Sequence, residues 1–165
     1  MDKPTEIIKP ILEIENLTID FNNKNRVTRA IEGITFSLKR NQILGIVGES
    51  GSGKSVTSMA ILKLLSVAQS KVVSGSIRFQ DGNEFVDLLK LNSREIRKYR
   101  GNRISMIFQE PMTSLNPSMR CGKQVAEVLR AHQSITAKEA RKAVISLFEE
   151  VMLPRPENIY SSYPH

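Results

Sequence analysis

GESGSGKS at residues 48–55 is the stretch that decides the fold of this 165-residue chain. It matches the pattern G-x-x-x-x-G-K-[ST], which has meaning only where a strand precedes it and a helix follows it. Residues 42–47 (QILGIV) are apolar without alternation, which is typical of a strand buried on both faces. Residues 56–65 (VTSMAILKLL) have helical spacing. Together the three segments predict a strand–loop–helix unit of an α/β protein.

The residue types in this loop suit the binding of a nucleotide's phosphates. Gly48, Gly51 and Gly53 allow backbone conformations that a Cβ atom would forbid, so the loop can turn its N–H groups toward an anion. The following helix adds the positive end of its dipole. Lys54 can reach the β- and γ-phosphates, and the Ser55 hydroxyl can ligate the Mg²⁺ that bridges them. A glycine-rich connection without a ligand is the alternative, which the complete pattern disfavours.

Further strands are predicted on both sides of this unit. Alternating apolar and polar residues at 11–21 and 30–38 predict two antiparallel strands joined by a polar linker, with one face toward water. After the loop and its helix, strands are expected at 75–80, 85–91 and 103–109, with a turn at 81–83. The strand at 103–109 is also mostly apolar, which favours a parallel core.

Three more helices are predicted in the second half of the chain. They are expected at 93–99, 124–132 and 136–153. Ser93 is the predicted N-cap of the first, and Thr136 with Glu139 predicts a capping box at the start of the last. The tail at 155–165 has no periodicity, so no element is predicted there.

Composition and charge narrow the class of protein. The chain is 40% hydrophobic and 25% charged, as in an ordinary globular protein, and no apolar run approaches the ~20 residues that span a bilayer. The N-terminal residues lack the layout of a signal peptide, and Cys121 is the only cysteine, so we expect a protein that is not exported. The chain has a net charge of +7, and its basic residues cluster at 93–103 and 136–142. Such clusters can bind nucleic acid, but no recognition motif with interleaved aromatic residues accompanies them. We therefore interpret them as solvated helix faces.

Two phrases carry a resemblance to a known family. The stretch GIVGESGSGKS, followed by ISMIFQEPMTSLNP at 104–117, resembles the ATP-binding subunits of ABC transporters. FQEPMTSLNP is similar to the oligopeptide and dipeptide importer branch in particular, and the resemblance covers nearly the whole chain. It implies an α/β P-loop NTPase fold of ABC type, with an N-terminal antiparallel β-unit, an incomplete parallel core and part of a helical subdomain. The implied domains are 1–110 for the β-unit and nucleotide-binding core, and 111–165 for the Q-loop and the start of the helical subdomain.

The resemblance also implies ATP and Mg²⁺ as cofactors, held by defined residues. Those implied to bind the nucleotide are Phe21, Gly48, Glu49, Ser50, Gly51, Ser52, Gly53, Lys54, Ser55 and Val56. Phe21 stands where the family has an aromatic ring that stacks on adenine; a core phenylalanine at a strand end is the alternative. Gln109 matches the Q-loop glutamine, which is implied to position water and, with Ser55, to ligate Mg²⁺. Glu110 receives no catalytic role, because the family's catalytic glutamate comes later.

The family's later motifs are not found in this sequence. These are the LSGGQ-like signature, the Walker B strand ending in Asp, the catalytic Glu and the switch His. In relatives a Tyr-Pro-His phrase stands directly before the signature, and here Tyr163-Pro164-His165 ends the chain, so we expect a truncated chain that binds nucleotide without turning it over. Without a neighbouring strand, residues 42–47 would have an open apolar edge, so we also expect low stability and aggregation.

As a full-length family member, the protein is expected to be an ATPase that drives import of peptides or similar small solutes. The implied partners are transmembrane permease subunits and a second ATP-binding subunit, without nucleic acid, at the cytoplasmic face of the inner membrane. A soluble ABC-type ATPase acting on nucleic acid or the ribosome is the main alternative. The basic surface mildly favours it, while SLNP at 114–117 argues against it. A P-loop kinase and an inert gene fragment are further alternatives.

Overall fold

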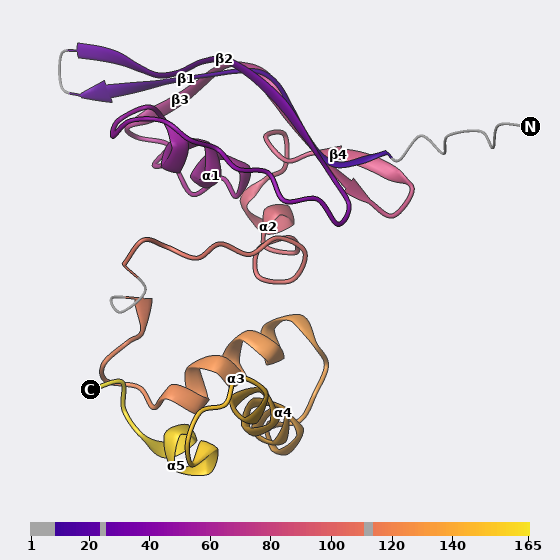
Figure 1. Cartoon of the computed structure of the whole chain (residues 1–165), viewed down its shortest axis with the longest axis vertical. Coiled ribbons are helices and arrows are strands. Elements are labelled where there is room, and N and C mark those ends of the chain that lie inside the picture. Colours follow the sequence, from indigo (N-terminus) through magenta and orange to yellow (C-terminus); the bar gives the residue numbers. More distant parts are fainter. Residues whose placement is uncertain (1–8, 24–25, 111–113) are drawn as a thin grey trace, which may run out of the picture. The chain divides into compact units, whose positions relative to one another are not determined.

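The computed structural model describes residues 9–23, 26–110 and 114–165, and the chain forms two compact units, Met1–Arg100 and Gly101–His165. The first unit contains a sheet with the strand order β2-β1-β3-β4, in which all neighbours are antiparallel (Figure 1). The strands are β1 Pro10–Asn23, β2 Arg26–Lys39, β3 Ser70–Asp81 and β4 Glu84–Asp87. The two antiparallel strands expected before the phosphate loop are confirmed. The third strand begins earlier than residue 75, because it pairs along much of β1.

The core of the first unit joins the sheet to two short helices, α1 (Lys54–Ile61) and α2 (Ser93–Ile96). Residues of β1 and β3, such as Ile14, Ile19 and Ile77, are fully buried. Tyr99, just after α2, packs edge to face against Phe79 of β3, with ring centroids 6.0 Å apart and planes at 82°. The aromatic contact therefore fixes the segment after α2 against the sheet.

Helix α2 begins at a different cap from the one predicted. The Asn92 side chain accepts hydrogen bonds from the backbone N–H groups of Arg94 (2.9 Å) and Glu95 (3.0 Å). The Glu95 carboxylate accepts in turn from the Asn92 N–H (2.7 Å), which completes a capping box. The prediction of Ser93 as N-cap is wrong, because only Asn92 has a glutamate three residues later.

Two segments that were expected to be strands of a parallel core do not form strands. Residues 42–47 are all exposed, and the side chains of Ile43 and Val47 reach 97% and 93% exposure. Within 103–109, Ile104 alone forms a bridge, and Ile107 is 90% exposed. A strand buried on both faces needs hydrogen-bonding neighbours and apolar cover. The two strand predictions are wrong for this structure, because the strands among the described residues offer no parallel neighbour to either segment.

The second unit is built from three helices, α3 (Cys121–His132), α4 (Ala137–Glu150) and α5 (Pro156–Ser161). Its core consists of Ala126, Ala140, Val144 and Phe148. The capping box predicted for α4 is confirmed, since Thr136 Oγ1 accepts from the Glu139 N–H (3.3 Å) and the Glu139 carboxylate accepts from the Thr136 N–H (2.7 Å).

Helix α5 lies in the tail for which no element was predicted. Pro156 at its first turn is a favoured helix start, and it was the available sequence signal. The ring of Tyr160 covers Gly122 of α3 so closely that a Cβ atom on Gly122 would overlap it. The Cys121 N–H also donates to the Ser162 carbonyl (2.8 Å). These contacts hold α5 against the start of α3, and tertiary packing rather than local periodicity explains the helix.

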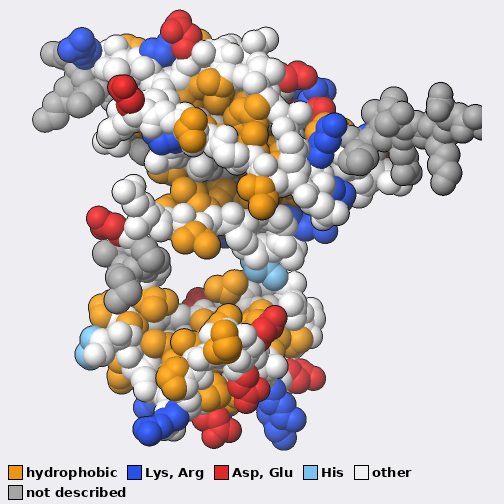
Figure 2. All heavy atoms as spheres, viewed as in Figure 1, with side chains coloured by type: hydrophobic (Ala, Val, Ile, Leu, Met, Phe, Trp, Pro, Cys, Tyr) orange, Lys and Arg blue, Asp and Glu red, His pale blue; other side chains and the backbone are white. Residues whose placement is uncertain are grey.

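Apolar side chains reach the surface of both units. Figure 2 shows hydrophobic groups gathered on the viewed face of each unit, among charged groups at the edges. The large exposed hydrophobic residues include Ile43, Val47, Val67, Ile107 and Met152. Among the helices of the described ranges, none has both the length and the apolar character needed to cross a membrane.

Candidate nucleotide-binding site

The predicted phosphate loop forms a tight turn that depends on glycine. Gly51 and Gly53 have φ angles of +83° and +88°, which side chains with a Cβ atom rarely adopt. The Ser52 N–H donates to the Glu49 carbonyl (3.2 Å), closing the turn between them. A Cβ atom on Gly48 would come within 2.7 Å of Ser52 Oγ, so the loop folds back on its own first residue. The backbone is thus curled as an anion-binding nest requires.

Gly53 also connects the loop to the sheet. It is the N-cap of α1, and a Cβ atom there would lie 2.6 Å from the Ala30 carbonyl oxygen and 3.2 Å from Ile31 Cγ1 on β2. The buried Thr57 donates its N–H (2.8 Å) and its hydroxyl (3.0 Å) to the Gly53 carbonyl. These contacts fix the start of α1 against β2. They thereby also fix the position of the N–H groups in the first turn of the helix.

The first turn of α1 has the electrostatics of an anion site. Its N-cap, Gly53, has no side chain to cap it, and the turn contains no acidic residue. The free N–H groups and the positive end of the dipole are therefore available to a phosphate. Ser55 lies exposed in this turn, and Val56 follows it half-buried. A hydroxyl at this position fits the hard oxygen ligands that Mg²⁺ prefers.

The Lys54 side chain folds back over the loop. Its ammonium group donates to the carbonyl oxygens of Gly48 (2.7 Å) and Glu49 (2.6 Å) and to Ser52 Oγ (3.1 Å). The positive charge therefore lies at the turn itself. Since all three acceptors are neutral, a phosphate anion would compete well for the same donors.

The other two predicted site residues lie away from the turn in sequence. Phe21 is half-buried on β1, opposite Thr28 of β2 and Ser70 of β3. Gln109 belongs to the second unit, where it is exposed and borders a cavity of about 550 Å³ together with Phe108, Glu110 and Ser114. The roles of Phe21 in adenine stacking and of Gln109 in Mg²⁺ binding stay predictions. Within the described part of the chain, no three His, Cys, Asp or Glu side chains gather as metal ligands.

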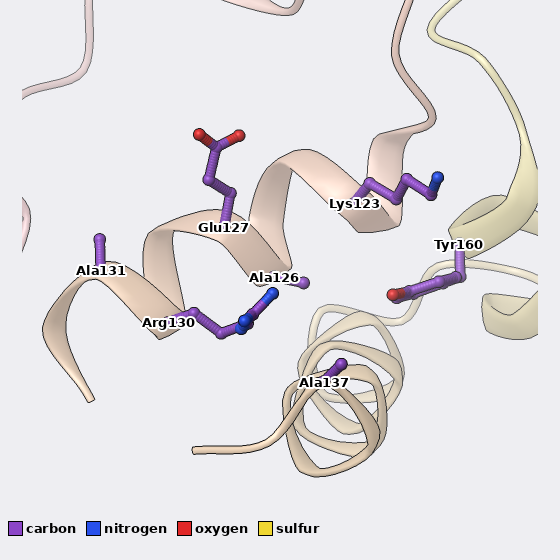
Figure 3. A pocket seen from close by; sticks show the side chains of 7 residues that line it. All are labelled: Lys123, Ala126, Glu127, Arg130, Ala131, Ala137 and Tyr160. Carbon is purple, nitrogen blue, oxygen red and sulfur yellow. The ribbon is translucent and has the colours of Figure 1, made fainter. Parts of the chain in front are cut away.

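A larger cavity, of about 670 Å³, lies in the second unit between α3, the start of α4 and α5 (Figure 3). Its lining consists of Lys123, Ala126, Glu127, Arg130, Ala131, Ala137 and Tyr160. The side chains of Arg130 and Tyr160 point toward one another across it (Figure 3). None of the residues expected to bind nucleotide lines this cavity.

The structure adds two basic residues to the surroundings of α1 that the sequence did not single out. Arg100 and Lys63 lie at the other end of α1, where they make hydrogen bonds to backbone carbonyls. The sequence placed Arg100 only within a basic cluster, because nothing in the local pattern distinguishes a capping arginine from a solvated one.

Comparison with known proteins agrees with the fold and shows the family. Residues 31–160 match the family model for the ABC transporter. The chain is 44% identical over 155 residues to the oligopeptide transport ATP-binding protein OppD of Bacillus subtilis (strain 168), covering 94% of this chain and 42% of that protein. It is 41% identical over 156 residues to the probable D,D-dipeptide transport ATP-binding protein DdpD of Escherichia coli (strain K12), covering 94% and 46%. The chain thus spans less than half the length of these relatives.

The solved structures confirm the fold class. The chain is similar to the ATP-binding cassette MJ0796, described as a dimeric post-hydrolysis state bound to ADP and Pi, with a TM-score of 0.75. The sequence identity is 21%, and the match covers 93% of this chain and 61% of that one. Because the family model matches well over half of the chain and the cassette fold agrees with it, the chain belongs to the ABC transporter family.

Proposed function

We propose that residues 48–56 bind the triphosphate of ATP together with Mg²⁺. The observation that carries this proposal is the Lys54 ammonium group, which lies over a glycine turn beside an uncapped helix N-terminus. Backbone N–H groups and the Lys54 charge would hold the phosphates, and Ser55 would serve as the Mg²⁺ ligand from this loop. Bound Mg²⁺ supplies charge neutralisation at the phosphates.

We further propose that the protein is the ATP-binding part of an importer for peptides or similar small solutes. The support comes from the relatives, whose names describe oligopeptide and D,D-dipeptide transport. In the whole protein, ATP binding and hydrolysis would drive transport through permease subunits and a second ATP-binding subunit at the cytoplasmic face of the membrane. Phe21 would stack on adenine, and Gln109 would contribute its amide to Mg²⁺ or water.

Titration with a fluorescent ATP analogue in the presence of Mg²⁺ tests the nucleotide site. Lys54→Ala should weaken binding at least about tenfold, because hydrogen bonds from a charged group contribute about 1.5–3 kcal/mol. Lys142→Ala is the matched control, since it removes the same charge from an exposed position on α4. Absence of saturable binding to the unsubstituted chain, or equal affinity of the Lys54→Ala variant, would refute the site.

Copurification with permease subunits tests the importer role separately. If the protein binds nucleotide but copurifies with ribosomes or nucleic acid instead, the proposal of the nucleotide site stands and the proposal of a transport role is refuted.

A further inference from the structure

The C-terminal end of the phosphate-loop helix α1 is held by an arginine. Arg100 donates from Nε to the Leu62 carbonyl (2.8 Å) and from Nη2 to the Lys63 carbonyl (2.7 Å). These carbonyls directly follow α1, where backbone acceptors have no partner within the helix. The positive guanidinium also lies at the negative end of the helix dipole, which favours its charge. Arg100 thus acts as a C-terminal cap from a distant part of the sequence.

Lys63 extends the connection in the opposite direction. Its ammonium group donates to the carbonyls of Leu89 (2.8 Å) and Leu91 (2.6 Å), in the segment between β4 and α2. Its backbone has a φ of +50°, which is uncommon for residues other than glycine. Such a conformation persists only where the surrounding contacts enforce it. The segment after α1 is therefore held from both sides, by Arg100 on its carbonyls and by the Lys63 side chain.

Helix α1 needs such an anchor more than most helices do. It has eight residues, and a helix of this length is not stable by itself. The segment before the loop, 42–47, is exposed and forms no strand, so it gives the loop no fixed support. The buried residues of this stretch are Gly53 and Thr57 at the helix start and Ala60 and Leu62 near its end.

We propose that Arg100, together with Lys63, is a positioning residue for nucleotide binding. This inference rests on the proposed function, since it concerns the same phosphate site. By fixing the far end of α1, the two residues hold the N-terminal N–H groups of the helix and Lys54 in the orientation that a triphosphate requires. A lysine at position 100 would not replace the arginine, because two separate N–H groups of one planar guanidinium reach two successive carbonyls.

The test is a nucleotide titration of each variant, together with a urea unfolding curve that gives its folded fraction. Arg100→Met, which keeps the apolar stem and removes the donors, should raise the Kd for a fluorescent ATP analogue by about tenfold, and Lys63→Met by about threefold. Arg100→Lys should fall between wild type and Arg100→Met. Arg97→Met is the matched control, since Arg97 is exposed three residues away, and its Kd should stay within about twofold of wild type.

The Kd corrected for the folded fraction separates positioning from a purely structural role. If Arg100 only helped the chain to fold, the apparent Kd of Arg100→Met would rise by no more than the factor set by its folded fraction, and the corrected Kd would equal the wild-type value; the proposal would then be wrong. Should Arg100→Met fail to fold, unchanged Kd values for Arg100→Lys and Lys63→Met would overturn the proposal in the same way. Loss of binding in the unsubstituted chain would instead refute the nucleotide site itself, so the two failures are distinguishable.

Discussion

Replacing Gly53 with alanine is the substitution whose effect the structure specifies most fully. Gly53 has φ +88° and ψ 1° at the junction between the phosphate loop and α1. A Cβ atom built there lies 2.6 Å from the Ala30 carbonyl oxygen and 3.2 Å from Ile31 Cγ1. The first of these contacts is with backbone, which cannot rotate away as the end of a side chain can. The alanine therefore meets both a conformational and a steric penalty.

The two penalties can be estimated separately. Holding a residue with a Cβ atom in a left-handed conformation costs about 1–2 kcal/mol. Relieving a close contact with well-packed neighbours typically costs a further ~1–3 kcal/mol. The sum is about 2–5 kcal/mol, and a change of ~1.4 kcal/mol alters a binding constant tenfold. If the loop changes its conformation to avoid the contact, nucleotide affinity should fall by at least about 30-fold. If the loop keeps its conformation, the free energy of unfolding should fall by about 2–5 kcal/mol.

Two alanine variants at other glycines act as controls for these two penalties. Gly51→Ala has a similar φ of +83° with no atom within 4 Å of its Cβ, so it should show the conformational penalty alone. Gly82→Ala, at φ +64° in the turn between β3 and β4, should reduce stability without weakening nucleotide binding. Titration with a fluorescent ATP analogue and urea unfolding measure the two quantities. Wild-type affinity and stability in Gly53→Ala, or equal losses in Gly51→Ala and Gly53→Ala, would refute this reasoning.

Two further predictions concern the second unit. Gly122→Ala should lower the free energy of unfolding of this unit by about 1–3 kcal/mol in a urea titration, because the new methyl group overlaps the Tyr160 ring. Gly45→Ala, in the first unit and with no atom within 4 Å of its Cβ, should leave the stability of the first unit unchanged. At Glu139, hydrogen bonds from the Thr136 hydroxyl and N–H hold the carboxyl pKa below its ordinary value of 4.5. A lowered pKa stabilises the fold above pH ~4.5 and loses that contribution as the pH falls through the folded-state value. Helicity measured by circular dichroism should therefore decline below pH ~4.5, and Glu139→Gln should show a smaller decline; identical acid profiles would contradict this.

The features that the sequence predicted well are local ones. The phosphate loop depends on glycines and a lysine within eight residues, and the structure has positive φ angles at Gly51 and Gly53. The capping box of α4 likewise needs two residues three positions apart. The N-cap of α2 was misplaced by one residue because both Asn92 and Ser93 can cap, and the choice depended on Glu95. Each of these features depends on residues that are neighbours in the chain, so it can be predicted from the sequence.

The features that it missed depend on contacts between distant residues. Arg100 shares its local composition with exposed basic neighbours, and only the approach of the segment after α1 makes it a cap. Helix α5 has too short a pattern to predict, and it is held by the packing of Tyr160 on Gly122. The parallel strands predicted at 42–47 and 103–109 are the opposite error. The apolar residues of these segments favour strands, but the described strands do not offer them a pairing partner.

The exposed segment at 42–47 also shows where the shape of the phosphate loop comes from. The loop has its curled backbone, and Lys54 lies over it, although the segment that leads into it forms no strand and Ile43 is 97% exposed. A strand before the loop is therefore not required for its conformation. The contacts that remain are the glycine turn itself, the packing of Gly53 on Ala30, and the anchoring of α1 at both ends. It follows that substitutions within 42–47 should alter nucleotide affinity less than substitutions at Gly53 or Arg100, because the loop is held from its helix side.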